Sequence, residues 1–302
     1  MGSGEMKEPV IFFSSSDLLE EVASFIARLN GQSRSHIGYC GKKQQEISSY
    51  LQNELTDVPF EKAFVLAYKN ETLIGVVGFD ADFEQKSAEV WGPFVEANHQ
   101  DQAIYLFKEM LPLLPSEVER LSMFPNKVNE TAVITATNFN FSKQSEQAIL
   151  IMRRNDYSAS QVSKLPFLTE QRNGEMIRLH NLAFPDTYYT GEEIIKRINE
   201  HRKVFYYLRE DKLAGYIYVE VEPEFSEASI EFFAVDDRFR GQSIGTELLK
   251  GAVSWIFSFK EIDELQLCVN STNNHAIRLY QKAGFKLSDE LYFFQKELKV
   301  PV

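Results

Sequence analysis

SIEFFAVDDRFRGQSIGTELLKGAV, residues 229–253, is the most informative stretch of this chain. It combines an apolar strand that ends at Val235, a short polar turn containing Gly241 and Gly245, and an amphipathic helix. At such a junction several backbone N–H groups lack helical partners, and the helix dipole favours negative charge. The stretch therefore predicts an anion site. Taken alone, it fits equally well a plain strand-to-helix turn with glycine present for steric reasons.

Two common nucleotide-binding motifs do not explain this turn. A nucleotide P-loop requires a Gly-Lys-Ser/Thr sequence, which is absent here. The dinucleotide fingerprint has another glycine spacing and follows the first strand of its sheet, whereas this turn follows several strands.

A second stretch, LCVNSTNNHAIRLYQKAGFKL at residues 267–287, strengthens the ligand interpretation. It predicts a strand followed by a helix in which Asn273, Ala276 and Tyr280 share one face. Gly284 fits the left-handed position that ends a helix. An amide and a phenol on one face can serve a bound ligand, although a half-buried core tyrosine is the simpler explanation of Tyr280.

Together the two stretches resemble the GCN5-related N-acetyltransferase (GNAT) superfamily. The turn is similar to the family's Arg/Gln-x-x-Gly-x-Gly/Ala motif, and Asn273-x-x-Ala276-x-x-Leu279-Tyr280 is similar to its Asn/Tyr helix. The resemblance covers about Leu165 to Lys296. It implies an α/β (α+β) fold, in which a mixed, mostly antiparallel twisted sheet is flanked by helices, and acetyl-CoA as the acyl donor.

The resemblance also implies roles for individual residues. The edge of the strand would pair with the pantetheine arm as an added strand does, and N–H groups of the turn would hold the pyrophosphate. Asn273 would contact the cofactor near its acyl end. Tyr280, a phenol with an unperturbed pKa near 10, would protonate the leaving thiolate after direct attack by an amine. The implied cofactor-binding residues are Phe233, Ala234, Val235, Arg240, Gly241, Gln242, Ser243, Ile244, Gly245, Thr246, Asn273 and Tyr280.

The chain departs from the family pattern at two places. Ser243 replaces the first motif glycine, and its Cβ restricts φ and crowds a phosphate, which predicts weaker cofactor binding or a shifted turn. Some members use a Glu on the strand before the Asn/Tyr helix as the general base. This chain has Cys268 there, which is a poor base unless its pKa is lowered. Glu231 is the alternative base, on the same strand face as Phe233 and Val235 by two-residue alternation. A solvated structural carboxylate, or a water chain as base, remains open.

The order of predicted elements recurs in the first half of the chain. An ungapped shift of 140 residues matches three successive strands, and a later shift of 144 matches the Asn/Tyr helix. This predicts two copies of one fold, residues 1–157 and 158–302, joined by the polar stretch Arg154–Pro166. The matched pairs include Leu73 with Leu213, Gly75 with Gly215, Ala88 with Ala228, Val95 with Val235, Asn129 with Asn273, and Phe141 with Phe285.

The first copy lacks the ligand residues of the second. It has Asp101 for Gly241, Tyr105 for Gly245 and Ala136 for Tyr280. A carboxylate repels phosphate, and a tyrosine prevents the close approach that glycine allows. Asn140, at the place of Gly284, keeps a residue that tolerates the left-handed conformation. The scaffold is therefore retained without the CoA site, which predicts a degenerate GNAT-like first domain and an acetyltransferase second domain.

The composition fits a cytoplasmic globular protein. The 302 residues correspond to about two domains, and the 44% hydrophobic and 25% charged fractions are ordinary. The net charge of −12 argues against nucleic acid, and no apolar run approaches the roughly 18 residues of a membrane span. The five histidines lack metal-ligand spacing, so we expect no metal. Cys40 and Cys268 cannot form a disulfide framework, and MGSGEMKEPV lacks the features of a signal peptide.

The sequence thus predicts an N-acetyltransferase that moves an acetyl group from acetyl-CoA to a primary amine of a small molecule or peptide. A CoA-binding sensor or scaffold with little catalysis is the alternative, which Ser243 and the unassigned base favour and Tyr280 opposes. Phe184-Pro185 and Tyr188-Tyr189 lie where the superfamily often borders its acceptor site. They are candidates for acceptor contacts, or aromatic anchors of a helix connection.

Overall fold

The computed structural model describes residues 9–157, 165–185 and 187–298. Contacts divide the chain into two compact units. Unit 1 comprises Met1–Gln147 and Asp289–Val302, and unit 2 comprises Ala148–Ser288. None of the helices in the described ranges is long and apolar enough to cross a membrane.

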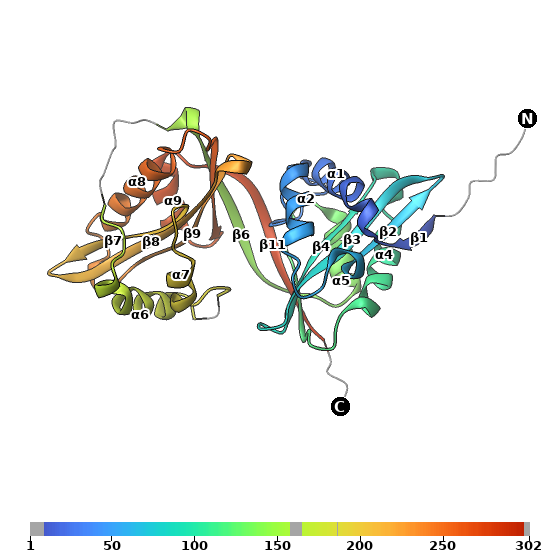
Figure 1. The fold of residues 1–302 in the computed structure, drawn as a ribbon, viewed down its shortest axis with the longest axis horizontal. Coiled ribbons are helices and arrows are strands. Elements are labelled where there is room, and N and C mark those ends of the chain that lie inside the picture. The colour runs from blue at the N-terminus through green and yellow to red at the C-terminus, as the bar shows by residue number, and fades with distance from the viewer. Residues whose placement is uncertain (1–8, 158–164, 186, 299–302) are drawn as a thin grey trace, which may run out of the picture. The chain divides into compact units, whose positions relative to one another are not determined.

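Unit 1 is a mostly antiparallel sheet flanked by helices (Figure 1). Its strands are β1 (Val10–Phe13), β2 (Phe64–Lys69), β3 (Thr72–Asp82), β4 (Ser87–Val95), β5 (Arg120–Met123) and the second part of β11 (Lys286–Glu297). They lie in the order β1-β2-β3-β4-β5-β11, and only β4 and β5 run parallel. Its helices are α1 (Leu19–Asn30), α2 (Gln44–Asn53), α3 (Phe60–Ala63), α4 (Gln102–Met110) and α5 (Glu130–Asn138).

Unit 2 repeats this plan. Its strands are the second part of β6 (Ser142–Arg153), β7 (Arg202–Arg209), β8 (Lys212–Glu222), β9 (Glu227–Val235) and β10 (Glu264–Asn270). They lie in the order β6-β10-β9-β8-β7, with β9 and β10 parallel and β7, β8 and β9 antiparallel. Its helices are α6 (Asn173–Ala183), α7 (Gly191–Arg197), α8 (Ile244–Ile256) and α9 (Asn274–Ala283). The predicted fold class, a mixed and mostly antiparallel sheet with flanking helices, is confirmed.

The central strand β8 of unit 2 is buried on both faces. Ile217 and Val219 belong to the apolar cluster that contains α8, whereas Tyr216 and Tyr218 belong to the cluster that contains α6 and α7. Because successive side chains of a strand point to opposite faces, α8 covers one face of the sheet and α6 and α7 cover the other.

The strand register confirms the predicted internal repeat. Residues that pair between neighbouring strands of unit 1 have counterparts that pair in unit 2. Their residue numbers are higher by 140 on the second and third matched strands and by 144 on the fourth. These pairs are Gly75–Val95 and Gly215–Val235 between the second and third matched strands, and Ser87–Arg120 and Glu227–Glu264 between the third and fourth.

The last strands of the two repeats are exchanged. In each repeat one long strand follows the last helix: β6 follows α5, and β11 follows α9. The repeat would place β6 beside β5, but β5 pairs with β11, and β6 lies beside β10. The units therefore divide near residues 147 and 288, whereas the sequence predicts a boundary between 157 and 158. Residues 158–164 of the predicted junction lie outside the described residues.

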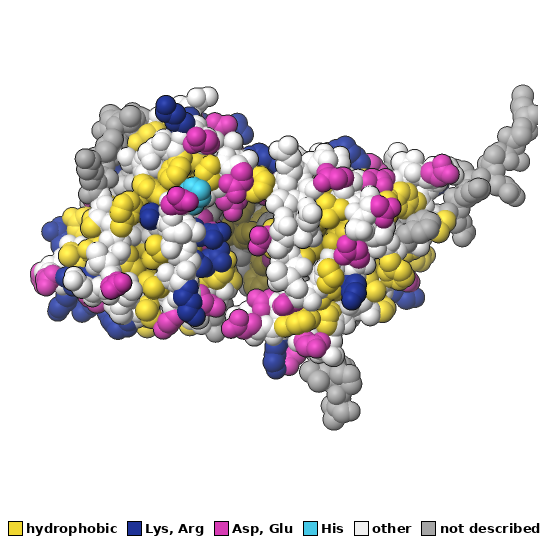
Figure 2. Space-filling view, viewed as in Figure 1, with side chains coloured by type: hydrophobic (Ala, Val, Ile, Leu, Met, Phe, Trp, Pro, Cys, Tyr) yellow, Lys and Arg dark blue, Asp and Glu magenta, His cyan; other side chains and the backbone are white. Residues whose placement is uncertain are grey.

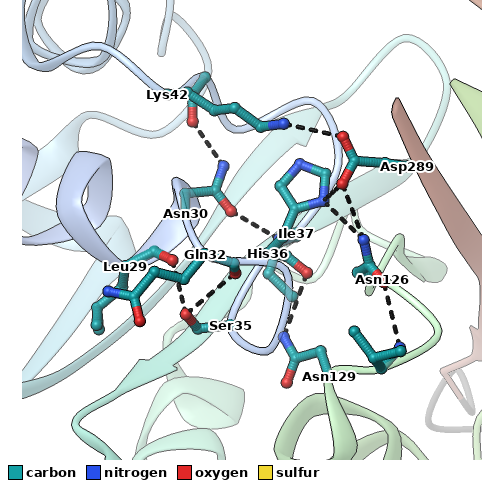
Figure 3. A network of polar contacts seen from close by, with 12 residues as sticks. Leu29, Asn30, Gln32, Ser35, His36, Ile37, Lys42, Asn126, Asn129 and Asp289 are labelled. Atoms are coloured by element: carbon teal, nitrogen blue, oxygen red, sulfur yellow. Dashed lines mark hydrogen bonds and ion pairs between the residues drawn. The ribbon is translucent and has the colours of Figure 1, made fainter. Parts of the chain in front are cut away.

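A buried polar network ties β11 into unit 1 (Figure 3). Asp289, which is 7% exposed, accepts a hydrogen bond from Asn126 Nδ2 at 2.9 Å and pairs with Lys42 Nζ at 2.9 Å. His36 Nδ1 lies 3.3 Å from the same carboxylate. Burial lowers the pKa of His36 to about 4, with a smaller contribution from Lys42, so His36 is neutral at pH 7. The carboxylate thus serves two buried partners, His36 and Asn126, and the half-exposed Lys42.

Removing this carboxylate should destabilise unit 1. We expect Asp289→Ala to lower the free energy of unfolding by about 2–3 kcal/mol, because it leaves buried hydrogen-bond donors without an acceptor. Urea unfolding of unit 1 can be followed by the fluorescence of Trp91 in a Trp255→Phe background, since each unit holds one of the two tryptophans.

The neighbouring Glu290 provides the control. It pairs with Lys127 at 3.0 Å, and its side chain is 47% exposed. Glu290→Ala should change the unfolding free energy by less than about 1 kcal/mol, as is usual for exposed pairs. Equal effects of the two substitutions would contradict the assigned role of Asp289.

Candidate active site

The parallel strands β9 and β10 of unit 2 form a fork. Their paired register runs from Glu227–Glu264 to Ile230–Leu267 and then stops, although β9 continues to Val235. Strand β8 pairs with β9 along its whole length, so only the edge of β9 that faces β10 becomes free. A free strand edge presents N–H and C=O groups that an extended ligand can pair with.

A β-bulge lies at the start of the free edge. Tyr218 pairs with Phe232 and the next residue, Val219, pairs with Ile230, so Glu231 is the extra residue. Ile230 and Phe232 consequently belong to clusters on opposite faces of the sheet. The prediction that Glu231 shares a strand face with Phe233 and Val235 rested on unbroken alternation, which the bulge interrupts.

The turn after β9 holds two residues in the left-handed conformation. Gly241 has φ +78°, and Ser243 has φ +61° and immediately precedes α8. A Cβ at Gly241 would meet no atom within 4 Å, so this glycine serves the backbone conformation and leaves open space beside it. Ser243 thus keeps the turn that glycine would favour, with some steric strain. The first N–H groups of α8 have no helical acceptor and border this turn.

Gly245, in the first turn of α8, is needed for close packing. A Cβ there would lie 3.3 Å from Leu279 Cδ2 and 3.3 Å from Phe233 Cζ. The absence of a side chain lets α8 approach both the fork and helix α9.

A cavity of about 550 Å³ opens beside the fork. It is lined by the C-terminal half of α6, by Phe233–Val235 of β9, by the turn with Arg238 and Arg240, and by Asn273. Acidic, basic and apolar side chains are interspersed on the face of unit 2 that Figure 2 shows.

The arginines of the turn are held by neighbouring carboxylates. Arg238 makes a bidentate contact with Asp236, with distances of 2.9 and 2.7 Å, and this hydrogen bonding lowers the pKa of Asp236 to about 2. Arg240 lies 2.7 Å from Asp237. Both guanidinium groups are more than half exposed, which leaves donors for an anion.

Asn273 and Tyr280 lie at the two ends of α9. Asn273 is the N-cap, and its Oδ1 accepts a hydrogen bond from Ala276 N at 3.1 Å, which leaves the amide Nδ2 to donate. Tyr280 is only 6% exposed and packs near Phe233 and Phe285. Burial, and then the nearby Cys268 thiol, raise the pKa of Tyr280 well above its ordinary value, so its phenol stays protonated at neutral pH. Gly284 ends the helix at φ +105°, which confirms its predicted left-handed role.

Glu231 is half-buried and faces the connection between α6 and α7. It accepts a hydrogen bond from the Tyr188 hydroxyl. Burial is the largest influence on Glu231 and raises the pKa of its carboxyl above the ordinary value.

In unit 1 a loop of the same unit pairs with the chain beyond β5, the strand that corresponds to β10. Residues 36–38 pair with residues 124–126, which continue β5: Gly38 N donates to Phe124 O at 2.8 Å, and Asn126 N donates to His36 O at 2.9 Å. The other edge of this segment pairs with β11, through Tyr292 N and Pro125 O. The loop therefore takes the edge that faces β4.

Other parts of unit 1 also differ from a ligand site. Asn129 caps α5 as Asn273 caps α9, but its Nδ2 donates to His36 O at 3.2 Å (Figure 3). Helix α4 begins at Gln102, so residues 102 and 103, which correspond to Gln242 and Ser243, are helical. Val90–Val95 of β4 are all buried, whereas alternate residues of the matching part of β9 are only partly buried. Asn140 has φ +58°, which confirms the left-handed conformation predicted for it.

A comparison with protein families now gives the relationship. Residues 173–285, all within unit 2, match the acetyltransferase (GNAT) family. Unit 2 therefore carries a domain of the GNAT acetyltransferase family.

Curated relatives of this GNAT protein match one part of its chain. The spermine/spermidine N(1)-acetyltransferase of Bacillus subtilis (strain 168) is 25% identical over 143 residues, which are 44% of this chain and 93% of the relative. An N-alpha-acetyltransferase of Sulfurisphaera tokodaii is 28% identical over 123 residues, 37% of this chain and 73% of the relative.

Solved GNAT structures resemble the whole chain in fold. A GCN5-related N-acetyltransferase from Sphaerobacter thermophilus has a TM-score of 0.71 at 13% identity and covers 96% of this chain and 95% of its own. A tandem GNAT protein from the clavulanic acid biosynthesis pathway has a TM-score of 0.63 at 12% identity, covering 96% and 98%. The two-unit architecture is therefore a known GNAT arrangement.

All residues that the sequence selected for the GNAT cofactor lie around the fork of unit 2. Phe233–Val235 form its free edge, Arg240–Thr246 form the turn and the start of α8, and Asn273 and Tyr280 lie on α9. The side chain of Ile244 is 1% exposed, so only its backbone is available. Sequence reasoning missed Arg178 and Leu182 of α6, which line the cavity, because no motif connects that helix with the fork.

Replacing Ser243 by glycine should relieve the strain in this turn. We expect the free energy of unfolding of Ser243→Gly to exceed that of Ser243→Ala by about 0.5–1 kcal/mol, because the two variants differ only in the Cβ that opposes positive φ. Urea unfolding followed by Trp255 fluorescence in a Trp91→Phe background measures this difference. Equal stability of the two variants would show that position 243 is unstrained.

Proposed function

We propose that unit 2 transfers an acetyl group from acetyl-CoA to a primary amine. The observation that carries this proposal is the free edge of β9 between a helix N-terminal turn and the buried phenol of Tyr280. An extended thioester with a pyrophosphate at its far end needs these three features together: backbone partners, an anion site and a proton donor.

The proposed donor fits the fork from both ends. The amide groups of pantetheine would pair with the backbone of Phe233–Val235, as an added strand does. The pyrophosphate would accept hydrogen bonds from N–H groups of the turn Gly241–Thr246, with Arg238 and Arg240 alongside. Asn273 Nδ2, whose Oδ1 already caps α9, would donate to the cofactor near its acyl end.

Transfer then follows from the positions of two proton-carrying groups. The amine nitrogen attacks the thioester carbon, and the C–S bond breaks. Tyr280, protonated because burial raises its pKa, gives its proton to the leaving thiolate. The new amide nitrogen loses a proton, which restores the phenol through solvent.

Glu231 is the proposed base. The acceptor arrives mainly as an ammonium ion and must lose one proton before it can attack. Glu231 can accept a proton only in its ionised form, which dominates above its raised pKa. Activity should therefore rise as the pH increases through that pKa. The carboxyl later releases the proton to solvent, so each turnover yields one acetamide, one thiol and one proton.

We further propose that unit 1 is a degenerate copy without a CoA site. Its loop 36–38 already pairs with the chain beyond β5, and the amide of Asn129 is bonded to His36. Ala136 replaces Tyr280, and α4 starts where the phosphate turn would be. Unit 1 would therefore support the fold rather than perform transfer.

The acceptor is proposed to be a small-molecule or peptide amine. The relatives named above are a spermine/spermidine acetyltransferase and an N-alpha-acetyltransferase, which by name acetylate amines of these two kinds. We also propose a cytoplasmic location, because the two cysteines of the chain cannot form a disulfide framework.

The competing function is a CoA sensor with little catalysis. The positive φ of Ser243 favours a sensor, as does Cys268 at the place where some family members have a catalytic glutamate. The buried Tyr280 beside the fork favours an enzyme. A sensor would bind acetyl-CoA without releasing free thiol in the presence of amines.

Tyr280→Phe should separate the two functions. We expect kcat for thiol release, with acetyl-CoA and a panel of amines, to fall by at least about 100-fold, since general acid catalysis contributes about 10²–10⁴. The affinity for acetyl-CoA, measured by calorimetry, should stay within about threefold, because the ring is kept.

Tyr207→Phe is the matched control. Tyr207 is a partly buried tyrosine of β7 in the same unit, away from the fork, and this variant should keep the rate of the parent protein. Unchanged turnover in Tyr280→Phe would remove Tyr280 as the acid, and tight binding without turnover in the parent would establish the sensor.

A further inference from the structure

Two glutamates of unit 2 near α7 are in contrasting situations. Glu220 on β8 is bonded to Arg197 at 3.3 Å and to Arg202 at 3.0 Å, and the Tyr218 hydroxyl donates to it at 2.5 Å. Glu231 at the fork forms no ion pair with any cation in the described ranges. Its charge is therefore balanced by hydrogen bonds and by the more distant Arg197 rather than by a salt bridge.

The hydroxyl of Tyr188 occupies the position opposite Glu231. Its side chain is exposed to 54%, and its ring lies against Phe232 with centroids 4.9 Å apart. The donated hydrogen bond covers the carboxylate from the side of the connection between α6 and α7. The hydroxyl that donates to Glu231 thus lies at the end of an exposed side chain.

The backbone beside Tyr188 is fixed, in contrast to its side chain. His180, fully buried in α6, donates from Nε2 to the Tyr189 carbonyl oxygen at 2.7 Å, since that oxygen can only accept. Its Nδ1 then accepts from the Tyr216 hydroxyl at 2.6 Å. The guanidinium of Arg197 also lies 4.2 Å from the Tyr189 ring centroid. A fixed backbone with an exposed ring allows the Tyr188 phenol to turn away by rotation of its side chain alone.

We propose that the Tyr188 hydroxyl holds, in the free protein, the place on Glu231 that the ammonium group of the acceptor takes, and that the acceptor displaces it. This inference rests on the proposed transfer to an amine. Tyr188 is thereby a positioning residue. It keeps the Glu231 carboxylate oriented and keeps water away from it until a cationic amine arrives.

The exchange is chemically balanced. A neutral O–H donor leaves the carboxylate, and a charged N–H donor replaces it with a stronger, charge-assisted bond. No covalent bond changes in this step. A protonated amine supplies such a charged N–H donor, which fits the amine acceptor of the proposed function.

The charged groups around Glu231 set the pH range of this exchange. Burial raises the pKa of Glu231 most, and Glu220 from β8 raises it further, whereas hydrogen bonds from Ser229 and Tyr188 and the charge of Arg197 from α7 lower it. The Tyr189 phenol also lies near, with its own pKa raised mainly by burial, so it stays neutral. Removing the Tyr188 hydroxyl should therefore raise the pKa of Glu231.

The test compares Tyr188→Phe with Glu231→Gln and with the control Tyr207→Phe. At a pH well above the pKa of Glu231, Tyr188→Phe should lower the KM for the best amine of the panel about three- to tenfold, because the competing donor is gone. The acid limb of its pH profile for kcat/KM should move to higher pH. Glu231→Gln should raise the KM for the amine at least about tenfold and remove that limb, while the KM for acetyl-CoA and all values for Tyr207→Phe stay unchanged.

A binding measurement keeps this inference separate from the proposed function. Carbon-13 NMR of the glutamate carboxyl groups, assigned with Glu231→Gln, follows Glu231 directly during titration with pH and with 1,3-diaminopropane. We expect a higher pKa and tighter diamine binding in Tyr188→Phe than in the parent. If neither changes, Tyr188 does not occupy the ammonium position. If both change but no amine is acetylated, the proposed transfer is wrong and the amine site remains.

Discussion

Two parallel strands of unit 2 part after Ile230 and Leu267, and the backbone of β9 beyond that point must find partners elsewhere. The bulge at Glu231 starts this free edge, and the turn with Gly241 and Ser243 closes it. Each feature of the candidate site is placed by the fork. The edge offers backbone partners to the proposed extended ligand, the N-terminus of α8 offers N–H groups to its anionic end, and α9 brings Tyr280 near Phe233.

Unit 1 differs at the same place, because residues 90–95 of β4, the counterpart of β9, are all buried. Loop 36–38 pairs with the chain beyond β5, and the cap residue Asn129 donates to that loop instead of to a ligand. The exchanged strand β11 brings Asp289 into this region, where it binds Asn126 and Lys42. In the proposed degenerate copy, this loop and the buried polar network would take the place of a ligand site.

Much of this organisation could be predicted from local sequence, because it depends on local backbone needs. The shifts of 140 and 144 residues matched the strand register, and Gly284 and Asn140 adopt the left-handed conformation that helix ends require. The bulge at Glu231 could not be predicted, since it depends on the register with β8. The exchange of β6 and β11 could not be predicted either, because the two strands are equivalent in the repeat and either can complete either sheet. The loop at His36 has no counterpart in the family motifs, and Tyr188 became informative only once its hydroxyl was seen on Glu231.

The central claim is that the fork of unit 2 is open to acetyl-CoA and that the fork of unit 1 is closed. Hydrogen exchange of the full chain, measured with and without saturating acetyl-CoA, tests it most directly. The account predicts that amides of Phe232–Val235 and of Gly241–Thr246 become protected, while those of Trp91–Val95 and of residues 36–38 exchange as before. Protection in the unit 1 segments, or none along Phe232–Val235, would contradict it.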